Sequence, residues 1–512
     1  MGTTVKKYDL ILAFLLSLAA GLLLFRFCDN THYEGDDFAA YILQARALAE
    51  GRVEEQLRLN LFMHPSVIYN PSTAADTLTY VWGYPMLLLP VYLLRGFDIA
   101  QPLNIFFYKL PGLFSLSLFA GVLYLFYRRR FGVCLSGVLC LCMVFSIMED
   151  ANRIQTDYPF LLFSLLCFLL SELWFQRDPG RPHPALALGL GLSMWATVQL
   201  RLNGFTVSLL ILLEHLFLLA KARPRGRALA KELSPHLLLW VFTAVTALLL
   251  PVPTSNLSDV GLGSLSQGWA YFVRQMYDWS LALTSYSLSP FQLSLMVLLT
   301  GLFFLGLVCR LRQDSGYALF ILGTVLVNIS LHYNQGLRYF YNILPLMLLF
   351  VGWGCRAVHS FLLGLWSNLW YRRTLAGLTL AGLVLFSGVR MLSVYSTACY
   401  LASENQENAG LAEKNLYSDS CLEAYAFLRT QTPPEAVIAF YKPRALYLNT
   451  DRAAFRVGIN GHTLDEADYY MEFAVHHGTE LPEDAYHTME VVFDNGQILI
   501  YRCFPSLSDS SL

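Results

Sequence analysis

The sequence has little charge for its length. Asp, Glu, Lys and Arg together make up 14% of its 512 residues, while 55% of the residues are hydrophobic. A soluble globular chain carries about 25% charged residues. The deficit, together with a mean hydropathy of +0.47, excludes an ordinary soluble enzyme and predicts a polytopic α-helical membrane protein.

Several common sequence signatures are also missing. The chain contains no Walker or GxGxxG phosphate loop, so we expect no nucleotide-sugar donor. It shows no internal repeat and no low-complexity segment. The first apolar run, residues 10–25, follows Lys6 and Lys7 and is not followed by a small-residue cleavage pattern. This combination predicts a retained signal-anchor helix.

Cysteine is scarce in the polar parts of the chain. Most of the 10 cysteines lie in apolar runs, where a free thiol behaves as a small hydrophobic side chain. Only Cys399, Cys421 and Cys503 lie in polar sequence. A Cys421–Cys503 disulfide is compatible with an oxidising face of the membrane, and the sequence leaves this pairing open.

Apolar stretches alternate with basic clusters along most of the chain. A membrane span needs about 20 apolar residues, and Lys and Arg stay on the cytoplasmic side. With a cytoplasmic N-terminus, these rules predict about 11 transmembrane helices and an extracytoplasmic C-terminus. The predicted spans are residues 8–27, 104–127, 131–148, 159–175, a hairpin of two within 184–220, 237–253, 290–309, 316–332, 339–355 and 374–394.

The apolar run at 82–97 is not counted among these spans. It is short and contains Pro85 and Pro90. A span there would also move the basic cluster at 128–130 to the outer side, against the charge rule. We therefore expect an interfacial helix within a long first outer loop, residues 28–103.

The polar tail, residues 396–512, differs in composition from the predicted membrane domain, residues 1–395. It contains a predicted helix at 419–430 and a predicted strand at 436–441. The stretch 491–502, in which two apolar segments flank Asp-Asn-Gly, is typical of a β-hairpin. The tail therefore predicts a small extracytoplasmic α/β domain.

Ionisable residues gather at the predicted outer edge of the membrane domain, where charge is costly and usually functional. They are Asp36 and Asp37, Lys109, Arg153 with Asp157, Arg201, and Arg338 with Tyr339. A carboxylate activates an acceptor hydroxyl, and cations hold a phosphate. The set therefore predicts an active site on this face.

Each of these residues also has a structural alternative. Asp36 or Asp37 could be a helix N-cap, and Asp157 stands in a similar pattern before a proline. Arg153 could pair with Asp157, four residues further on. The alternative for the remaining cations, Lys109, Arg201 and Arg338, is anchoring at the membrane interface. Their common location on one face favours the active site.

Five segments occur in an order that matches a known family. They are "GDDFAAYILQARALAEG" (35–51), "WGYPMLLLPVYLL" (82–94), "YKLPGLFSLSLFAGVLYLFYRRRFG" (108–132), "NRIQTDYPFLLF" (152–163) and "LRYFYNILPLMLLF" (337–350). In the first, Asp36, Tyr41, Ala45 and Gly51 fall in place, and Asp37 replaces the usual Glu. This order resembles GT-C glycosyltransferases of the protein-mannosyltransferase and aminoarabinose-transferase kind, over most of the chain.

The resemblance implies a GT-C fold and an inverting glycosyl transfer on the outer face of the cell membrane. The donor would be a polyprenyl-phosphate sugar, and the acceptor an envelope glycan, lipid or protein. Asp36 would be the general base, accompanied by Asp37 and Asp157. The phosphate would be held by Lys109, Arg201 and Arg338, with Tyr41, Arg153 and Tyr339 in support. We expect no nucleic-acid partner.

Two other function classes stay open at this point. A transporter or flippase of lipid-linked glycans could use the same charges, although such proteins more often have repeated halves and charge near the midplane. A scaffold could bind a partner through the polar tail. A divalent metal ion bound by His32, Glu34, Asp36 and Asp37 is a minor alternative, because their spacing matches no specific ligand pattern.

Overall fold

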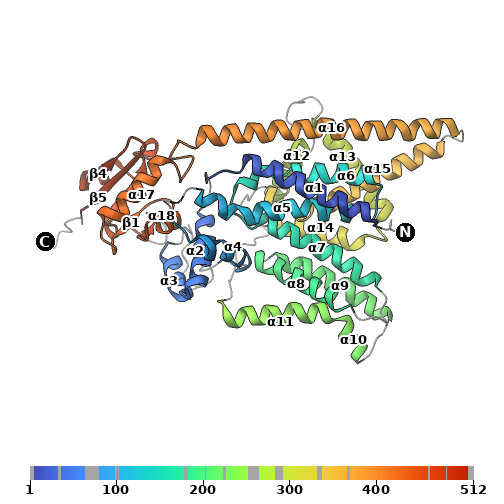
Figure 1. The fold of residues 1–512 in the computed structure, drawn as a ribbon, viewed down its shortest axis with the longest axis horizontal. Helices are drawn as coiled ribbons and strands as arrows, with labels where there is room; N and C mark the ends of the chain where they lie inside the picture. Colours follow the sequence, from blue (N-terminus) through green and yellow to red (C-terminus); the bar gives the residue numbers. More distant parts are fainter. Residues whose placement is uncertain are drawn as a thin grey trace.

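The computed structural model describes most of the chain. The described residues are 5–32, 36–63, 80–98, 101, 103–177, 183–201, 203–222, 226–251, 265–282, 292–330, 337–365, 369–458, 462–479 and 481–504. A helix lies in each of the eleven stretches predicted to span the membrane (Figure 1). These helices are α1 (Lys7–Phe27), α5 (Asn104–Arg128), α6 (Val133–Phe145), α7 (Asp157–Gln176), α8 (Pro184–Leu200), α9 (Gly204–Ala222), α11 (Ser234–Leu249), α13 (Gln292–Arg310), α14 (Ser315–Ile329), α15 (Leu344–Leu365) and α16 (Leu369–Asn408).

Length and composition identify the membrane-spanning part. Five helices, α1, α5, α7, α9 and α15, are long and apolar enough to cross a membrane, and α6, α8, α11, α13 and α14 are shorter apolar helices. The protein is therefore a polytopic α-helical membrane protein. The count of eleven spans stays a prediction, because α6, for example, has 13 residues where a span needs about 20.

Small residues let the helices of the bundle approach closely. On α15, a Cβ added at Gly354 would overlap the Leu302 carbonyl oxygen of α13, and one added at Gly306 of α13 would overlap the Phe350 carbonyl oxygen. A Cβ added at Gly121 of α5 would lie 2.8 Å from the Ala13 carbonyl oxygen of α1, which is also too close. Close backbone packing of this kind holds membrane helices together.

Some boundaries differ from the predicted ones. The helix predicted at 339–355 begins only at Leu344, because Pro345 fits the first turn of a helix. The preceding residues form a short 3₁₀ helix, η6 (Leu337–Phe340). Similarly, the helix predicted at 131–148 ends at Phe145, and η2 (Met148–Asn152) follows it.

The longest helix that was not predicted is α12 (Leu265–Ala282), which lies between two predicted spans. Its sequence, "LSQGWAYFVRQMYDWSLA", mixes apolar with polar residues and contains no run of membrane-spanning character. A search for apolar runs therefore passes over it. A short helix, α10 (Arg227–Glu232), also precedes α11.

The described part of residues 28–103, the predicted first outer loop, contains three helices, which lie at one end of the bundle (Figure 1). They are α2 (Asp37–Glu50), α3 (Val53–Met63) and α4 (Gly83–Arg95). The last of them confirms the helix predicted at 82–97, with Pro90 inside it. Residues 64–79 of the loop lie outside the described part of the chain.

The C-terminal domain is a small mixed sheet with helices, as predicted. The sheet order is β2-β1-β3-β5-β4, in which β1 is parallel to β2 and β3, and β5 is antiparallel to β3 and β4. Its elements are α17 (Asp419–Gln431), β1 (Val437–Ala439), α18 (Pro443–Thr450), β2 (Ala453–Phe455), η7 (Leu464–Glu466), β3 (Tyr469–Phe473), η8 (Ala474–His476), η9 (Glu483–Thr488), β4 (Met489–Asp494) and β5 (Ile498–Cys503). The predicted helix, strand and hairpin are all present, and Gly496 takes the positive φ of 80° that the hairpin turn needs.

The polar stretch that begins at residue 396 is helical in its first part. Helix α16 has 40 residues and is about 60 Å long, and it continues to Asn408. It therefore extends beyond a hydrocarbon core of about 30 Å and leads directly to the C-terminal domain (Figure 1). Residues 396–408, the first part of the predicted tail, therefore continue this helix.

The outer-loop helices and the C-terminal domain share one hydrophobic core. Phe38 and Ile42 of α2 lie in the same buried cluster as Tyr425 of α17, Leu446 of α18 and Ile500 of β5. The domain thus lies against the outer loop, at the end of the bundle opposite to the N-terminus (Figure 1). This packing places C-terminal residues beside the acid pair of the first loop.

Candidate active site

Asp36 is a buried structural contact between the first loop and the C-terminal domain. Its residue is 7% exposed, and its two carboxylate oxygens accept hydrogen bonds from the backbone N–H groups of Arg444 (3.1 Å) and Ala445 (2.9 Å). These groups belong to the first turn of α18, where N–H groups have no partner within the helix. Asp36 therefore caps α18 from outside, and burial raises the pKa of its carboxyl despite the nearby Arg444 charge and these hydrogen bonds.

Asp37 has the opposite environment. It is the first residue of α2, and its side chain is 49% exposed. Its Oδ1 accepts a hydrogen bond of 2.5 Å from the Tyr80 hydroxyl and lies 3.9 Å from Nη1 of Arg444. Asp36 occupies the N-cap position of α2, but neither its side chain nor that of Asp37 makes a capping hydrogen bond to this helix.

Arg444, Tyr80 and Asp37 form a chain of two hydrogen bonds that holds the Asp37 side chain in place. Nη1 of Arg444 donates to the Tyr80 hydroxyl at 3.1 Å, and this hydroxyl in turn donates to Asp37. Burial raises the pKa of Tyr80, and the Asp37 charge acts in the same direction, so the phenol stays a donor. Neither Tyr80 nor Arg444 was predicted as a site residue.

A buried ion pair lies beside this group. Asp157, the first residue of α7, contacts Nη1 of Arg201, which follows the last residue of α8. Their side chains are 3% and 13% exposed. The Arg201 guanidinium stacks 4.4 Å from the centre of the Tyr339 ring. Helix ends from three segments of the bundle thus meet at one point.

Arg338 and Tyr41 connect the ion pair to Asp37. Arg338 interacts electrostatically with Asp157, Asp37 and Tyr41, and its guanidinium lies 5.6 Å from the Tyr339 ring. The Tyr41 ring lies edge-on to Tyr80, with 4.9 Å between centroids. The structure therefore brings together six predicted residues: Asp37, Tyr41, Asp157, Arg201, Arg338 and Tyr339.

Lys109 lies outside this group. It is fully buried, and its Nζ donates to the Asp29 carbonyl (3.0 Å), the Thr31 carbonyl and the Asn152 side chain (2.6 Å). The Asp29 carboxylate lies 3.4 Å away. These oxygens surround the ammonium group, so Lys109 ties the first loop to α5 and η2 and has no donor left for a lipid phosphate.

Arg153 is also placed apart from the group. Its Nη1 pairs with Asp150 at 3.0 Å rather than with Asp157, the partner considered from the sequence. Asp150 also accepts a hydrogen bond of 2.5 Å from Tyr341. Arg153 therefore belongs to a neighbouring contact between η2 and the segment that precedes α15.

His32, Asp36 and Asp37, three of the four residues considered for a metal ion, do not form one donor set. Asp36 is directed to α18, whereas Asp37 is held by Tyr80. His32 stacks on Phe38, its Nε2 accepts from the Ile154 N–H at 3.3 Å, and burial lowers its pKa well below the usual range. Glu34 lies outside the described residues, and within them no three His, Cys, Asp or Glu are arranged for a metal.

The two cysteines considered for a disulfide are free thiols. Cys421 is buried at the start of α17, where its Sγ lies 3.7 Å from the Ala412 carbonyl oxygen. Cys503 is at the end of β5, and burial raises the pKa of its thiol to about 12. The tail is therefore held together by its shared core.

Comparison with known proteins gives matches only at the level of structure. No protein-family model and no curated protein sequence matches the chain. ArnT from Cupriavidus metallidurans bound to undecaprenyl phosphate aligns with a TM-score of 0.59 over 99% of this chain and 100% of its own, at 12% identity. The apo form of the same ArnT aligns with a TM-score of 0.55 over 97% and 99%, at 14% identity.

A second kind of transferase has the same architecture. The oligosaccharyltransferase AglB from Archaeoglobus fulgidus, in complex with an inhibitory peptide and a dolichol-phosphate, aligns with a TM-score of 0.52. The alignment covers 91% of this chain and 70% of AglB, at 10% identity. The chain therefore has the GT-C fold, as the sequence resemblance predicted.

Proposed function

We propose that the protein is an inverting glycosyltransferase that moves a sugar from a polyprenyl-phosphate donor to a hydroxyl of a cell-envelope acceptor. The observation that carries this proposal is the convergence of an exposed carboxylate, Asp37, with two arginines, Arg201 and Arg338, at one end of a GT-C bundle. A base for the acceptor and cations for a phosphate are what such a transfer needs.

Asp37 is the general base in this proposal, in place of Asp36. Both Asp36 oxygens accept backbone hydrogen bonds, and its side chain is buried. Asp37 is half exposed, and among the described residues only its Oδ1 accepts a hydrogen bond. Its Oδ2 takes the proton of the acceptor hydroxyl while that oxygen attacks the anomeric carbon.

The departing phosphate gives Arg201 and Arg338 their role in this proposal. As the new glycosidic bond forms, the bond between the anomeric carbon and the phosphate oxygen breaks, and its electron pair stays on the phosphate. Attack from the opposite face inverts the configuration. Arg201 and Arg338 stabilise the growing negative charge, since a guanidinium binds phosphate through two parallel hydrogen bonds. Asp157 orients Arg201 through their ion pair.

The same proposal assigns the two sides of the membrane. Basic residues such as Arg129, Arg310 and Arg356 lie at the end of the bundle that carries the N-terminus, and this end is assigned to the cytoplasm. The candidate site and the C-terminal domain then lie outside, where polyprenyl-linked sugars meet envelope acceptors.

Binding of the lipid phosphate tests the proposal before the sugar is known. Purified full-length protein should bind undecaprenyl phosphate, and Arg338→Gln should weaken this binding about tenfold, which corresponds to one charge-assisted hydrogen bond. Mass spectrometry of envelope glycans from cells with and without the gene then identifies the product. Scrambling of lipid-linked glycans by reconstituted protein without any new glycan would instead support a flippase.

A further inference from the structure

A polar cavity of about 870 Å³ lies at the end of the bundle opposite to the candidate active site. Helix α7 connects the two places: Asp157 begins it at the candidate active site, and Glu172 lines this cavity. At 1.5 Å per residue, the two are about 22 Å apart along the helix. The cavity is therefore separate from the site proposed for glycosyl transfer.

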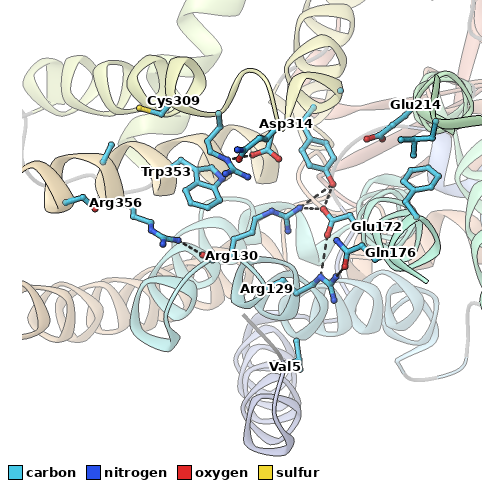
Figure 2. A pocket seen from close by; sticks show the side chains of 18 residues that line it. Val5, Arg129, Arg130, Glu172, Gln176, Glu214, Cys309, Asp314, Trp353 and Arg356 are labelled. Carbon is cyan, nitrogen blue, oxygen red and sulfur yellow. Dashed lines mark hydrogen bonds and ion pairs between the residues drawn. The ribbon is translucent and has the colours of Figure 1, made fainter. Parts of the chain in front are cut away.

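Four arginines and three acids line the cavity. The arginines are Arg129, Arg130, Arg310 and Arg356, and the acids are Glu172, Glu214 and Asp314. Figure 2 shows Glu172 and Gln176 on one side and Arg356 and Trp353 on the other, with Arg130 between them and its guanidinium reaching Glu172. The lining thus has a surplus of positive charge.

One wall of the cavity is held by a network of ion pairs and hydrogen bonds around Glu172. The Arg130 guanidinium contacts Glu172, which also accepts a hydrogen bond of 2.5 Å from the Tyr317 hydroxyl. Arg129 lies 3.5 Å from the second Glu172 oxygen and donates to Gln176 at 2.6 Å (Figure 2). The side chains of Arg130 and Glu172 are only 10% and 16% exposed, so this wall is fixed in place.

The facing wall keeps donors for a ligand. Arg310 and Arg356 lie 4.1 and 5.3 Å from the ring centre of Trp353. Among the described residues, Arg310 donates one hydrogen bond, to Asp314, and Arg356 donates one, to the Arg130 carbonyl oxygen. A guanidinium has five N–H donors, so most of theirs remain for a bound anion.

We propose that this cavity binds the phosphate headgroup of an anionic phospholipid. Arginine matches the geometry of phosphate, and basic pockets between transmembrane helices bind anionic headgroups. Apolar residues complete the lining, including Phe175 and Leu218. Next to Leu218, α9 exposes Leu213 (56%) and Phe217 (62%), which provide a surface for the acyl chains. This apolar continuation favours a lipid over a soluble anion.

Native mass spectrometry of the full-length protein in detergent tests this proposal. Phosphatidylglycerol should bind more tightly than phosphatidylcholine. Arg356→Gln should weaken phosphatidylglycerol binding about fivefold, the effect of one Arg near an anionic surface. Arg312→Gln is the matched control, because Arg312 is exposed at the same end and does not line the cavity, and it should leave binding unchanged.

Two further measurements test whether the lipid binds in this cavity and whether the bound phosphate belongs to a lipid or is inorganic phosphate. Brominated phosphatidylglycerol should quench the fluorescence of Trp353, so Trp353→Phe should lose this part of the quenching. Inorganic phosphate at equal concentration should not displace the lipid. Equal binding of the two phospholipids, or equal loss in both arginine variants, would overturn the proposal. Displacement by inorganic phosphate would overturn the assignment to a lipid.

Discussion

At the scale of single residues, the adjacent acids Asp36 and Asp37 have different surroundings. Asp36 precedes α2 with φ −106° and ψ −6°, whereas Asp37 is its first helical residue. Asp36 is thereby directed to the first turn of α18, and Asp37 to Tyr80 and the arginines. The sequence indicated an active site at this acid pair, but the choice between its members depends on a domain more than 400 residues away along the chain.

Asp36 should therefore contribute to stability, and in a pH-dependent way. Asp36→Ala removes the cap of α18 and should cost about 1 to 2 kcal/mol. Because burial raises the pKa of Asp36, folding favours the neutral carboxyl more than the unfolded chain does. Its stabilisation should be full below the unfolded value of about 3.9 and decline as the pH rises through the raised pKa. Thermal unfolding of Asp36→Asn should lack this decline, and an unchanged decline would contradict the burial of Asp36.

Arg444 should act as a positioning residue. It holds Tyr80, which holds Asp37, so Arg444→Gln should lower kcat about tenfold or more while KM for the donor stays within about twofold. Arg444→Lys should restore part of kcat, because it keeps the charge but not the geometry. Loss of stability with unchanged kcat per folded molecule would show that Arg444 serves only the domain contact.

Lys109 should be important for folding rather than for donor binding. Lys109→Met leaves the partly exposed Asp29 carboxylate and the Asn152 side chain without their ammonium partner, which should cost about 1 to 3 kcal/mol. Folded protein recovered at low temperature should still bind undecaprenyl phosphate. If the variant folds with normal stability and loses that binding, the phosphate role first expected for Lys109 is restored.

At the scale of elements, α13 and α15 form a close contact that depends on glycine. Gly354→Leu would place a side chain against the Leu302 carbonyl oxygen, so the helices must separate, and the unfolding temperature should fall by several degrees. Gly364 lies on the same helix with nothing within 4 Å of an added Cβ, and Gly364→Leu is the matched control. Equal stability of the two variants would contradict this packing.

The helices and strands also show which sequence signals are sufficient to predict an element. A helix occupies each of the eleven long apolar stretches, because burying such a run in lipid requires a helix. The Asp-Asn-Gly turn was sufficient for the β4–β5 hairpin. The amphipathic α12 and the late start of α15 were missed, since hydropathy alone registers neither a mixed pattern nor a proline in the first turn.

At the scale of the whole molecule, the outer loop and the C-terminal domain form one unit at one end of the bundle. Tyr80 and Arg444 were not predicted as site residues, because they meet only through the shared core of these two parts and the contacts of Arg444. Each stands in an ordinary local context, and their pairing arises only when segments more than 360 residues apart are packed together. The arginines and Asp157 were predictable, because charge at a membrane edge is itself a signal.

The placement of the C-terminal domain gives the molecule two distinct ends. Asp37, Arg201 and Arg338 meet beside the domain, and the cavity of Arg129 and Arg356 lies at the other end. We assign the first end to glycosyl transfer and the second to an anionic lipid.

The most direct measurement compares Asp37→Asn with Asp36→Asn in cells that lack the native protein. Mass spectrometry of the envelope glycans gives the yield of product, and membrane abundance of each variant serves as the control. Asp37→Asn should reduce sugar transfer at least about 100-fold, the effect of losing a general base, while Asp36→Asn should keep most of it. Full transfer by Asp37→Asn, with loss confined to a well-expressed Asp36→Asn, would contradict the assignment of Asp37 as the base.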